Sequence, residues 1–82
     1  PDLIYFDPAL VDFALANQGL SLKQFAAKTN LAFNTLRGLH RRQGLHPSSA
    51  LKIASTLGLQ VSDLFAPWDR RYRPPALAHG PA

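Results

Sequence analysis

The chain contains no cysteine, no apolar run long enough to cross a membrane, and no acidic residue between positions 23 and 52. The absence of cysteine excludes disulfides, zinc fingers and thiol chemistry. The absence of a long apolar run excludes a membrane-spanning helix, and the opening residues lack the basic region and apolar core of a secretion signal. We therefore expect a protein of the reducing cytoplasm, with one domain at most in 82 residues.

Charge is strongly segregated along the chain. Residues 1–22 contain aspartates and no base, whereas residues 23–52 contain bases and no acid. Such segregation costs self-repulsion unless an anion compensates it, and a solvated basic face is the alternative interpretation. The bases of the second segment are Lys23, Lys28, Arg37, Arg41, Arg42 and Lys52.

Helix start and stop signals predict five helices. Asp7 followed by Pro8 is typical of a helix start, and Gly19 is typical of a helix end. Ser21 and Gln24 have the spacing of a capping box at the start of the next helix. The five predicted helices span about residues 8–18, 22–29, 32–42, 47–57 and 63–66, the last with Ser62 as its cap.

The two ends of the chain differ from this helical middle. The run LIYF is β-prone, and residues 67–82 are rich in proline and arginine, which favours an extended segment. We therefore predict an all-α domain over residues 7–66. An N-terminal arm over residues 1–6 and a C-terminal arm or tail over residues 67–82 would flank it.

The segment GLSLKQFAAKTNLAFNTLRGLHRR, followed by ALKIASTLGLQVSDLF, resembles the helix-turn-helix domain of the Xre/Cro/phage-repressor family. The similarity covers roughly residues 8–66 and lies in the small and apolar residues of the second and third helices and in the two later helices. It implies a five-helix lambda-repressor-like fold whose third helix enters the major groove of DNA.

The sequence departs from the family pattern at four places. Asn30 stands where a turn glycine is usual, and Ala32 where a capping serine or threonine is usual. Leu22 replaces the usual glutamine, which removes one family contact to DNA, and Arg41-Arg42 replace the usual Asn-Gly. Loss of the cap at the third helix costs about 1 kcal/mol.

The third helix provides the expected base contacts. Leu31, Leu36 and Leu39 hold the helix on its support, so that its other side faces outward. Asparagine can read adenine, arginine can read guanine, phenylalanine can contact a thymine methyl, and glycine permits close approach. The alternatives are solvent exposure for the asparagine and a phosphate contact or a solvated charge for the arginine. For the phenylalanine the alternative is packing against the first helix or a dimer partner, and for the glycine it is simple tolerance. The expected base-contacting residues are Phe33, Asn34, Arg37 and Gly38.

Residues around the third helix are expected to contact phosphates. Two arginines at the end of the third helix and one residue near an end of each of the second and third helices belong to this group. Two serines at the start of the fourth helix belong to it as well, because the free amides at a helix start favour an anion. Ordinary capping is the alternative for the serines. The expected phosphate-contacting residues are Lys23, Thr35, Arg41, Arg42, Ser48 and Ser49.

Apolar residues outside the predicted helices are candidates for a dimer interface. An apolar cluster of this size usually has a partner, and operators for such domains are commonly palindromic. The alternative is that Trp68 folds back to cover a small core. The candidate interface consists of Leu3, Ile4, Tyr5, Phe6, Phe65, Trp68 and Tyr72.

No residue pattern indicates an enzyme. His40, His46 and His79 have no carboxylate or cysteine at ligand spacing, so we expect no metal, and no glycine-rich phosphate loop or other cofactor motif is present. The serines are explained by helix caps. We therefore expect neither catalysis nor a cofactor.

These features favour a sequence-specific regulator of transcription that binds double-stranded DNA. The resemblance implies a bacterial or phage-encoded, nucleoid-associated repressor that acts as a homodimer on a palindromic operator. One alternative is an antitoxin that regulates its own promoter and holds a toxin with LIYF or with the C-terminal tail. Another is a protein-interaction module that does not bind DNA.

Overall fold

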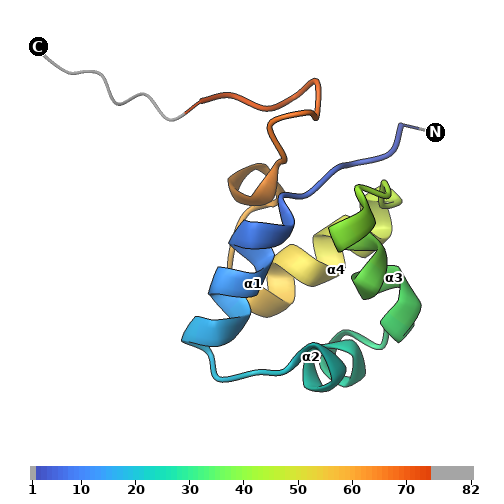
Figure 1. Cartoon of the computed structure of the whole chain (residues 1–82), viewed down its shortest axis with the longest axis vertical. Coiled ribbons are helices and arrows are strands. Elements are labelled where there is room, and N and C mark those ends of the chain that lie inside the picture. The colour runs from blue at the N-terminus through green and yellow to red at the C-terminus, as the bar shows by residue number, and fades with distance from the viewer. Residues whose placement is uncertain (1, 75–82) are drawn as a thin grey trace, which may run out of the picture.

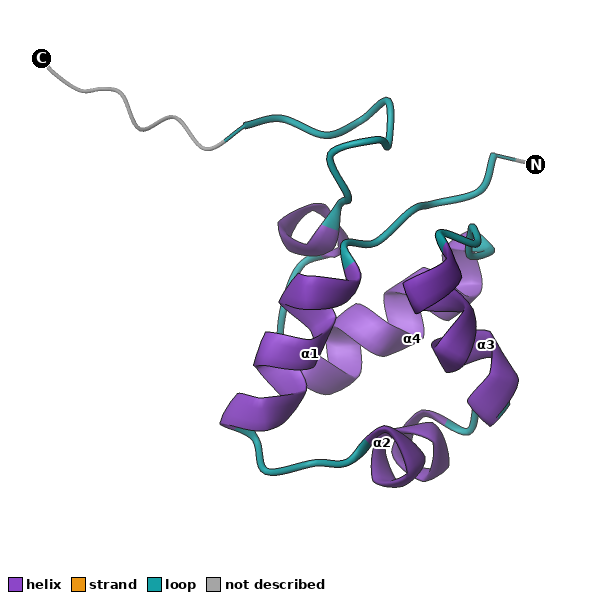
Figure 2. Ribbon diagram, in the orientation of Figure 1, coloured by secondary structure: helices purple, strands orange, loops and turns teal. Residues whose placement is uncertain are grey.

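The computed structural model describes residues 2–74, which form a mostly helical fold (Figures 1 and 2). The predicted all-α class is confirmed. In Figure 1, α1 and α3 lie on either side of α4, and α2 lies below them. The helical elements of residues 2–74 are α1 (Pro8–Asn17), α2 (Leu22–Thr29), α3 (Phe33–Arg37), the 3₁₀ helix η1 (Gly38–Arg41), α4 (Pro47–Leu57) and the 3₁₀ helix η2 (Val61–Leu64).

The first two helices begin at the predicted caps. The Asp7 carboxylate accepts a hydrogen bond from the amide of Ala9 at 3.0 Å. Ser21 Oγ accepts from the amide of Gln24 at 3.1 Å, and Gln24 Oε1 accepts in return from the amide of Ser21 at 2.8 Å. Asn30 ends α2 in the left-handed conformation, with φ of 60°, which asparagine tolerates better than most residues. Local side-chain chemistry therefore sets these boundaries.

The predicted third helix is two elements rather than one. α3 begins after Ala32, which cannot cap it, and the α-helical conformation ends at Arg37. At Gly38 the chain tightens into η1, because glycine weakens an α-helix and a short 3₁₀ turn commonly follows one. η1 ends at Arg42, which is left-handed with φ of 58°. The predicted continuous helix is therefore wrong beyond its first five residues.

The predicted fifth helix is a 3₁₀ helix of the same length that starts and ends two residues earlier. η2 is capped by Gln60, whose amide donates to Asp63 Oδ2 at 2.9 Å, and not by Ser62, which lies inside the element. Phe65 leaves η2 in an extended conformation and forms an isolated bridge with Phe6. The pairing of these two phenylalanines stops the helix before the predicted end.

One side of each helix builds the core. α1 contributes Val11 and Leu15, whereas its Leu10 is exposed. α4 contributes four buried residues, and α3 with η1 contributes two leucines. The core cluster consists of Phe6, Val11, Leu15, Phe25, Ala26, Leu36, Leu39, Leu45, Ala50, Ile53, Ala54, Leu57 and Leu64.

The N-terminal segment, residues 2–6, is not a free arm. Ile4 and Leu45 exchange two backbone hydrogen bonds, at 2.8 and 2.7 Å, which pair the segment with the loop after η1. Phe6 is 2% exposed and belongs to the core. Long-range pairing and burial therefore make the segment part of the domain, contrary to the prediction of a separate arm.

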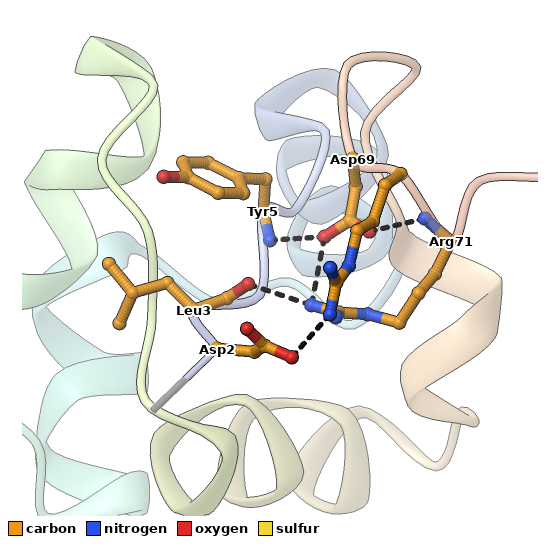
Figure 3. Close-up of polar contacts among 6 residues, drawn as sticks. Asp2, Leu3, Tyr5, Asp69 and Arg71 are labelled. Atoms are coloured by element: carbon orange, nitrogen blue, oxygen red, sulfur yellow. Dashed lines mark hydrogen bonds and ion pairs between the residues drawn. The ribbon is translucent and has the colours of Figure 1, made fainter.

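The segment after η2, residues 65–72, folds back onto the N-terminal segment around a buried carboxylate. Asp69 Oδ2 accepts from the amide of Tyr5 at 2.8 Å, and Oδ1 accepts from the amide of Arg71 at 2.7 Å (Figure 3). The first part of the predicted C-terminal arm is therefore packed against the domain. Residues 75–82 of the predicted tail lie outside the described residues.

Candidate nucleic-acid interface

The α3–η1 segment has one buried side and one polar side. Leu36 is 0% exposed and Leu39 is 2% exposed, so both leucines are anchored in the core. Asn34, Arg37 and Arg41 are exposed on the other side. This is the orientation that the sequence predicted, and it presents one carboxamide and two guanidinium groups to solvent.

Phe33 and Arg37 lie one helical turn apart on this polar side. The guanidinium carbon of Arg37 is 5.8 Å from the centre of the Phe33 ring, within the range of a cation–π contact. Phe33 is exposed, so its ring does not pack in the core. The contact limits the positions open to Arg37, and both groups stay accessible to a partner.

Gly38 does not belong to the exposed side. It is buried, and Gln43 Oε1 occupies the space that a Cβ at Gly38 would need. The amide of Gln43 donates to the Gly38 carbonyl at 3.0 Å, which closes the turn. The expectation of a base contact at Gly38 is therefore wrong. The exposed Gln43 carboxamide lies beside Gly38 instead. The sequence gave no sign of the backbone turn between Gly38 and Gln43 that places it there.

The lysines and arginines between residues 23 and 52 have no acidic partner among residues 2–74. Only a histidine of this range is ion-paired, and the other two pairs involve arginines of the segment after η2. The basic charge of α2, α3 and η1 is therefore uncompensated within the described part of the chain. The ion pairs of residues 2–74 are His40–Asp12, Arg70–Asp2 and Arg71–Asp69.

The His40–Asp12 pair connects η1 to α1. His40 Nε2 and Asp12 Oδ2 are 2.9 Å apart, and both side chains are about half exposed. The contact joins residues 28 positions apart, so sequence spacing gave no sign of it. It ties one end of the polar side to the first helix.

The remaining phosphate-contact candidates lie near helix starts. Lys23 is exposed in the first turn of α2, and Thr35 is half-buried in α3. Ser48 is exposed and Ser49 half-buried at the start of α4, where the cap residue provides no side-chain acceptor. The first amides of α4 therefore lack a side-chain partner from the cap. Contact of any of these residues with phosphate stays a prediction.

Arg42 and Trp68, predicted for separate roles, lie together. The guanidinium carbon of Arg42 is 4.3 Å from the centre of the Trp68 ring, the shortest such distance among residues 2–74. Both residues are exposed. The segment after η2 therefore reaches the end of η1 through this pair.

Part of the predicted dimer surface makes internal contacts instead. Phe6 is buried in the core, so its assignment to an interface is wrong. Leu3 and Trp68 are exposed, but the Trp68 ring is in contact with the guanidinium of Arg42. The half-buried members of the predicted surface are Ile4, Tyr5, Phe65 and Tyr72.

Among residues 2–74, the most exposed large apolar side chain lies on α1. Phe13 is 66% exposed. Together with Leu10 it borders a hollow of about 280 Å³ whose other walls include Leu57, Leu59 and Leu64. The sequence did not reveal this surface, because α1 has apolar residues on both its inner and its outer side.

Within residues 2–74, no group of three or more histidine, aspartate or glutamate side chains is arranged to hold a metal ion, and His79 lies outside this range. No helix in the same range has both the length and the apolar character that crossing a membrane demands. Comparison with protein-family models, with curated proteins and with solved structures found no match. The family resemblance therefore depends on the residues of this chain alone.

Proposed function

We propose that the chain is a sequence-specific regulator of transcription that places α3 and η1 in the major groove of double-stranded DNA. The observation that carries the proposal is the two-sided α3–η1 segment. Its leucines are anchored in the core, and its exposed arginines have no acidic partner among residues 2–74. An exposed segment with uncompensated positive charge, and with a carboxamide that can hydrogen-bond to a base, suits the DNA major groove.

The dimensions of the segment fit this role. Five α-helical and four 3₁₀ residues extend about 15 Å in all, against a major groove about 12 Å wide. A segment of that length covers about four base pairs. This is an appropriate size for one half-site.

The exposed residues divide into two proposed roles. Asn34 and Arg37 are the base readers, since asparagine pairs bidentately with adenine and arginine with guanine. Arg41, Arg42 and Lys23 are the phosphate contacts, which position the domain without reading sequence. Gln43, which covers Gly38, takes the place expected for a base contact at the glycine.

The five-helix lambda-repressor-like description and the helix-turn-helix motif belong to this proposal. α2, the turn at Asn30 and α3 supply the motif, η2 serves as the fifth helix, and Ala26 is the small residue at the crossing of α2 and α3. A homodimer that represses from a palindromic operator follows from the same resemblance. Two copies double the contacts, which one domain of this size needs for tight specific binding.

Selection of bound sequences from random duplex DNA tests the proposal. We expect enrichment of two short half-sites related by symmetry. Binding should weaken with salt at a log–log slope of about −0.9 for each phosphate contacted. Lack of enrichment, together with no preferred footprint at physiological salt, would remove the proposal.

A second candidate function, the binding of another protein, is favoured by the exposed Phe13 and the hollow beside it. Exposed apolar patches commonly mark protein-binding surfaces. An antitoxin that also binds DNA would use this surface rather than LIYF, because Phe6 is in the core. Co-purification with the product of a neighbouring gene supports this function. Protein binding with no DNA binding at any salt concentration would favour a pure interaction module.

A further inference from the structure

We infer that Trp68 is a positioning residue for DNA binding: its indole holds the guanidinium of Arg42 at the edge of the α3–η1 surface. The inference depends on the proposed function and extends it to the segment after η2. That segment would then contribute to DNA affinity without touching a base.

The conformation of Arg42 gives the first reason. It is left-handed, with φ of 58°, in a region where side chains other than glycine, asparagine and aspartate are strained. Its side chain pairs with no acid among residues 2–74 and lies instead 4.3 Å from the centre of the Trp68 ring. The left-handed backbone and the contact with Trp68 together restrict the direction of the Arg42 side chain.

The anchoring of Trp68 gives the second reason. The residues on both sides of it bind the same N-terminal residue: the amide of Ala66 donates to the Tyr5 carbonyl at 2.7 Å, and Asp69 accepts from the Tyr5 amide at 2.8 Å (Figure 3). The Arg71 guanidinium also donates to the carbonyl of Leu3 at 2.7 Å. The backbone that carries Trp68 is therefore anchored both before and after it.

The N-terminal segment contacts both chain segments that carry the Arg42–Trp68 pair. Ile4 pairs with Leu45, three positions after Arg42. A Cβ added to Gly44 would lie 2.6 Å from Leu3 Cβ, so the segment crosses directly over the loop that carries Arg42. In Figure 1 the N-terminal segment lies between this loop and the segment after η2, in agreement with these contacts. The three chain segments are joined by these contacts, so the backbones that carry Arg42 and Trp68 are connected through the N-terminal segment.

A preordered arginine contacts phosphate at a lower entropic cost than a free one, because less rotamer freedom is lost on binding. Loss of the indole should therefore weaken binding to every DNA sequence by a similar factor. The number of phosphates contacted, and with it the salt slope, should stay the same. Loss of Arg42 itself should reduce that slope.

The first test uses the free protein. Trp68 is the single tryptophan of the chain, so its fluorescence reports on the stack without a label. Arg42→Asn removes the guanidinium and suits the left-handed backbone, whereas alanine would add strain. We expect a shifted emission maximum in Arg42→Asn and an unchanged one in the control Arg37→Asn. Identical spectra for wild type and Arg42→Asn would overturn the inference.

The second test is a double-mutant cycle on a selected DNA site. Trp68→Leu should weaken binding about two- to fivefold, the value of an exposed cation–π contact. Trp68→Phe keeps an aromatic face and should recover most of the loss. Arg42→Asn should lower the magnitude of the salt slope by about 0.9, and Trp68→Leu should have no further effect in that background. Additive losses would overturn the inference.

Each failure has its own signature. If the wild-type chain selects no DNA, the proposed function fails, whatever the fluorescence shows. If it binds DNA but the cycle is additive, only the positioning role fails. If Trp68→Leu does not fold by circular dichroism, DNA titrations monitored by Trp68 fluorescence decide. A response in wild type that persists in Arg42→Asn would overturn the inference, and a lost response would support it.

Discussion

α1 and the α3–η1 segment use the same inner surface chemistry and opposite outer chemistry. Each buries two aliphatic side chains in the common core, Val11 and Leu15 in α1 and Leu36 and Leu39 in α3–η1. Outward, α1 presents apolar residues with an acid, while α3–η1 presents bases and a carboxamide beside one aromatic ring, Phe33. The inner surfaces explain why the chain folds. Only the outer surfaces distinguish an anionic partner from an apolar one.

The largest expected effect is a loss of stability when the buried side of α3 is changed. Leu36→Ala should lower the free energy of unfolding by about 2–5 kcal/mol, because it removes a fully buried side chain and leaves a cavity. Urea denaturation followed by circular dichroism measures this loss. Asn34→Ala, on the outer side of the same helix, is the matched control and should change stability by at most about 0.5 kcal/mol. Equal losses for the two variants would contradict the two-sided description.

The next largest effect is expected on DNA sequence discrimination when the exposed side of α3 is changed. Asn34→Ala should reduce discrimination at one base-pair position by about 1–3 kcal/mol, because a bidentate contact to adenine is lost. Binding to duplexes that vary one position at a time measures this difference. Arg41→Ala is the control, and it should weaken all the duplexes alike. If Asn34→Ala also weakens all sequences equally, Asn34 is not a base reader.

The difference between predicted and unpredicted features follows the range of the interactions. The caps at Asp7 and Ser21 depend on neighbours within a few residues, so the sequence predicted them. The outward direction of Asn34 and Arg37 followed from the spacing of the leucines behind them. Local chemistry and periodicity therefore predicted α1, α2 and α4 and the outward direction of Asn34 and Arg37.

Features that depend on distant residues escaped prediction. Phe6 is buried because it meets Phe65, and Asp69 is buried because Tyr5 donates to it. In each case the sequence showed residue types compatible with exposure, and only the tertiary pairing decided the outcome.

Capping provides the third comparison between the two helices. α1 begins with a side-chain cap at Asp7, and α3 begins at Ala32 with none. Ala32→Ser should therefore stabilise the domain by about 1 kcal/mol, because its hydroxyl can accept from an amide in the first turn of α3. For a domain of this size, that gain raises the melting temperature by about 4–8 °C. Ala9→Ser, just inside α1, is the control and should give no such gain, because Asp7 already caps that helix.

The smallest effect is expected on the outer side of α1. Phe13→Ser should change the free energy of unfolding by at most about 0.5 kcal/mol, because the ring is 66% exposed and no core contact depends on it. Binding to a duplex with a single half-site should also be unchanged, since Phe13 borders the hollow lined by Leu57, Leu59 and Leu64 and not η1. Chemical denaturation and fluorescence anisotropy measure the two quantities. A loss of half-site affinity comparable to that of Arg41→Ala would mean that α1 belongs to the DNA interface. The separation between an apolar and an anionic binding surface would then be wrong.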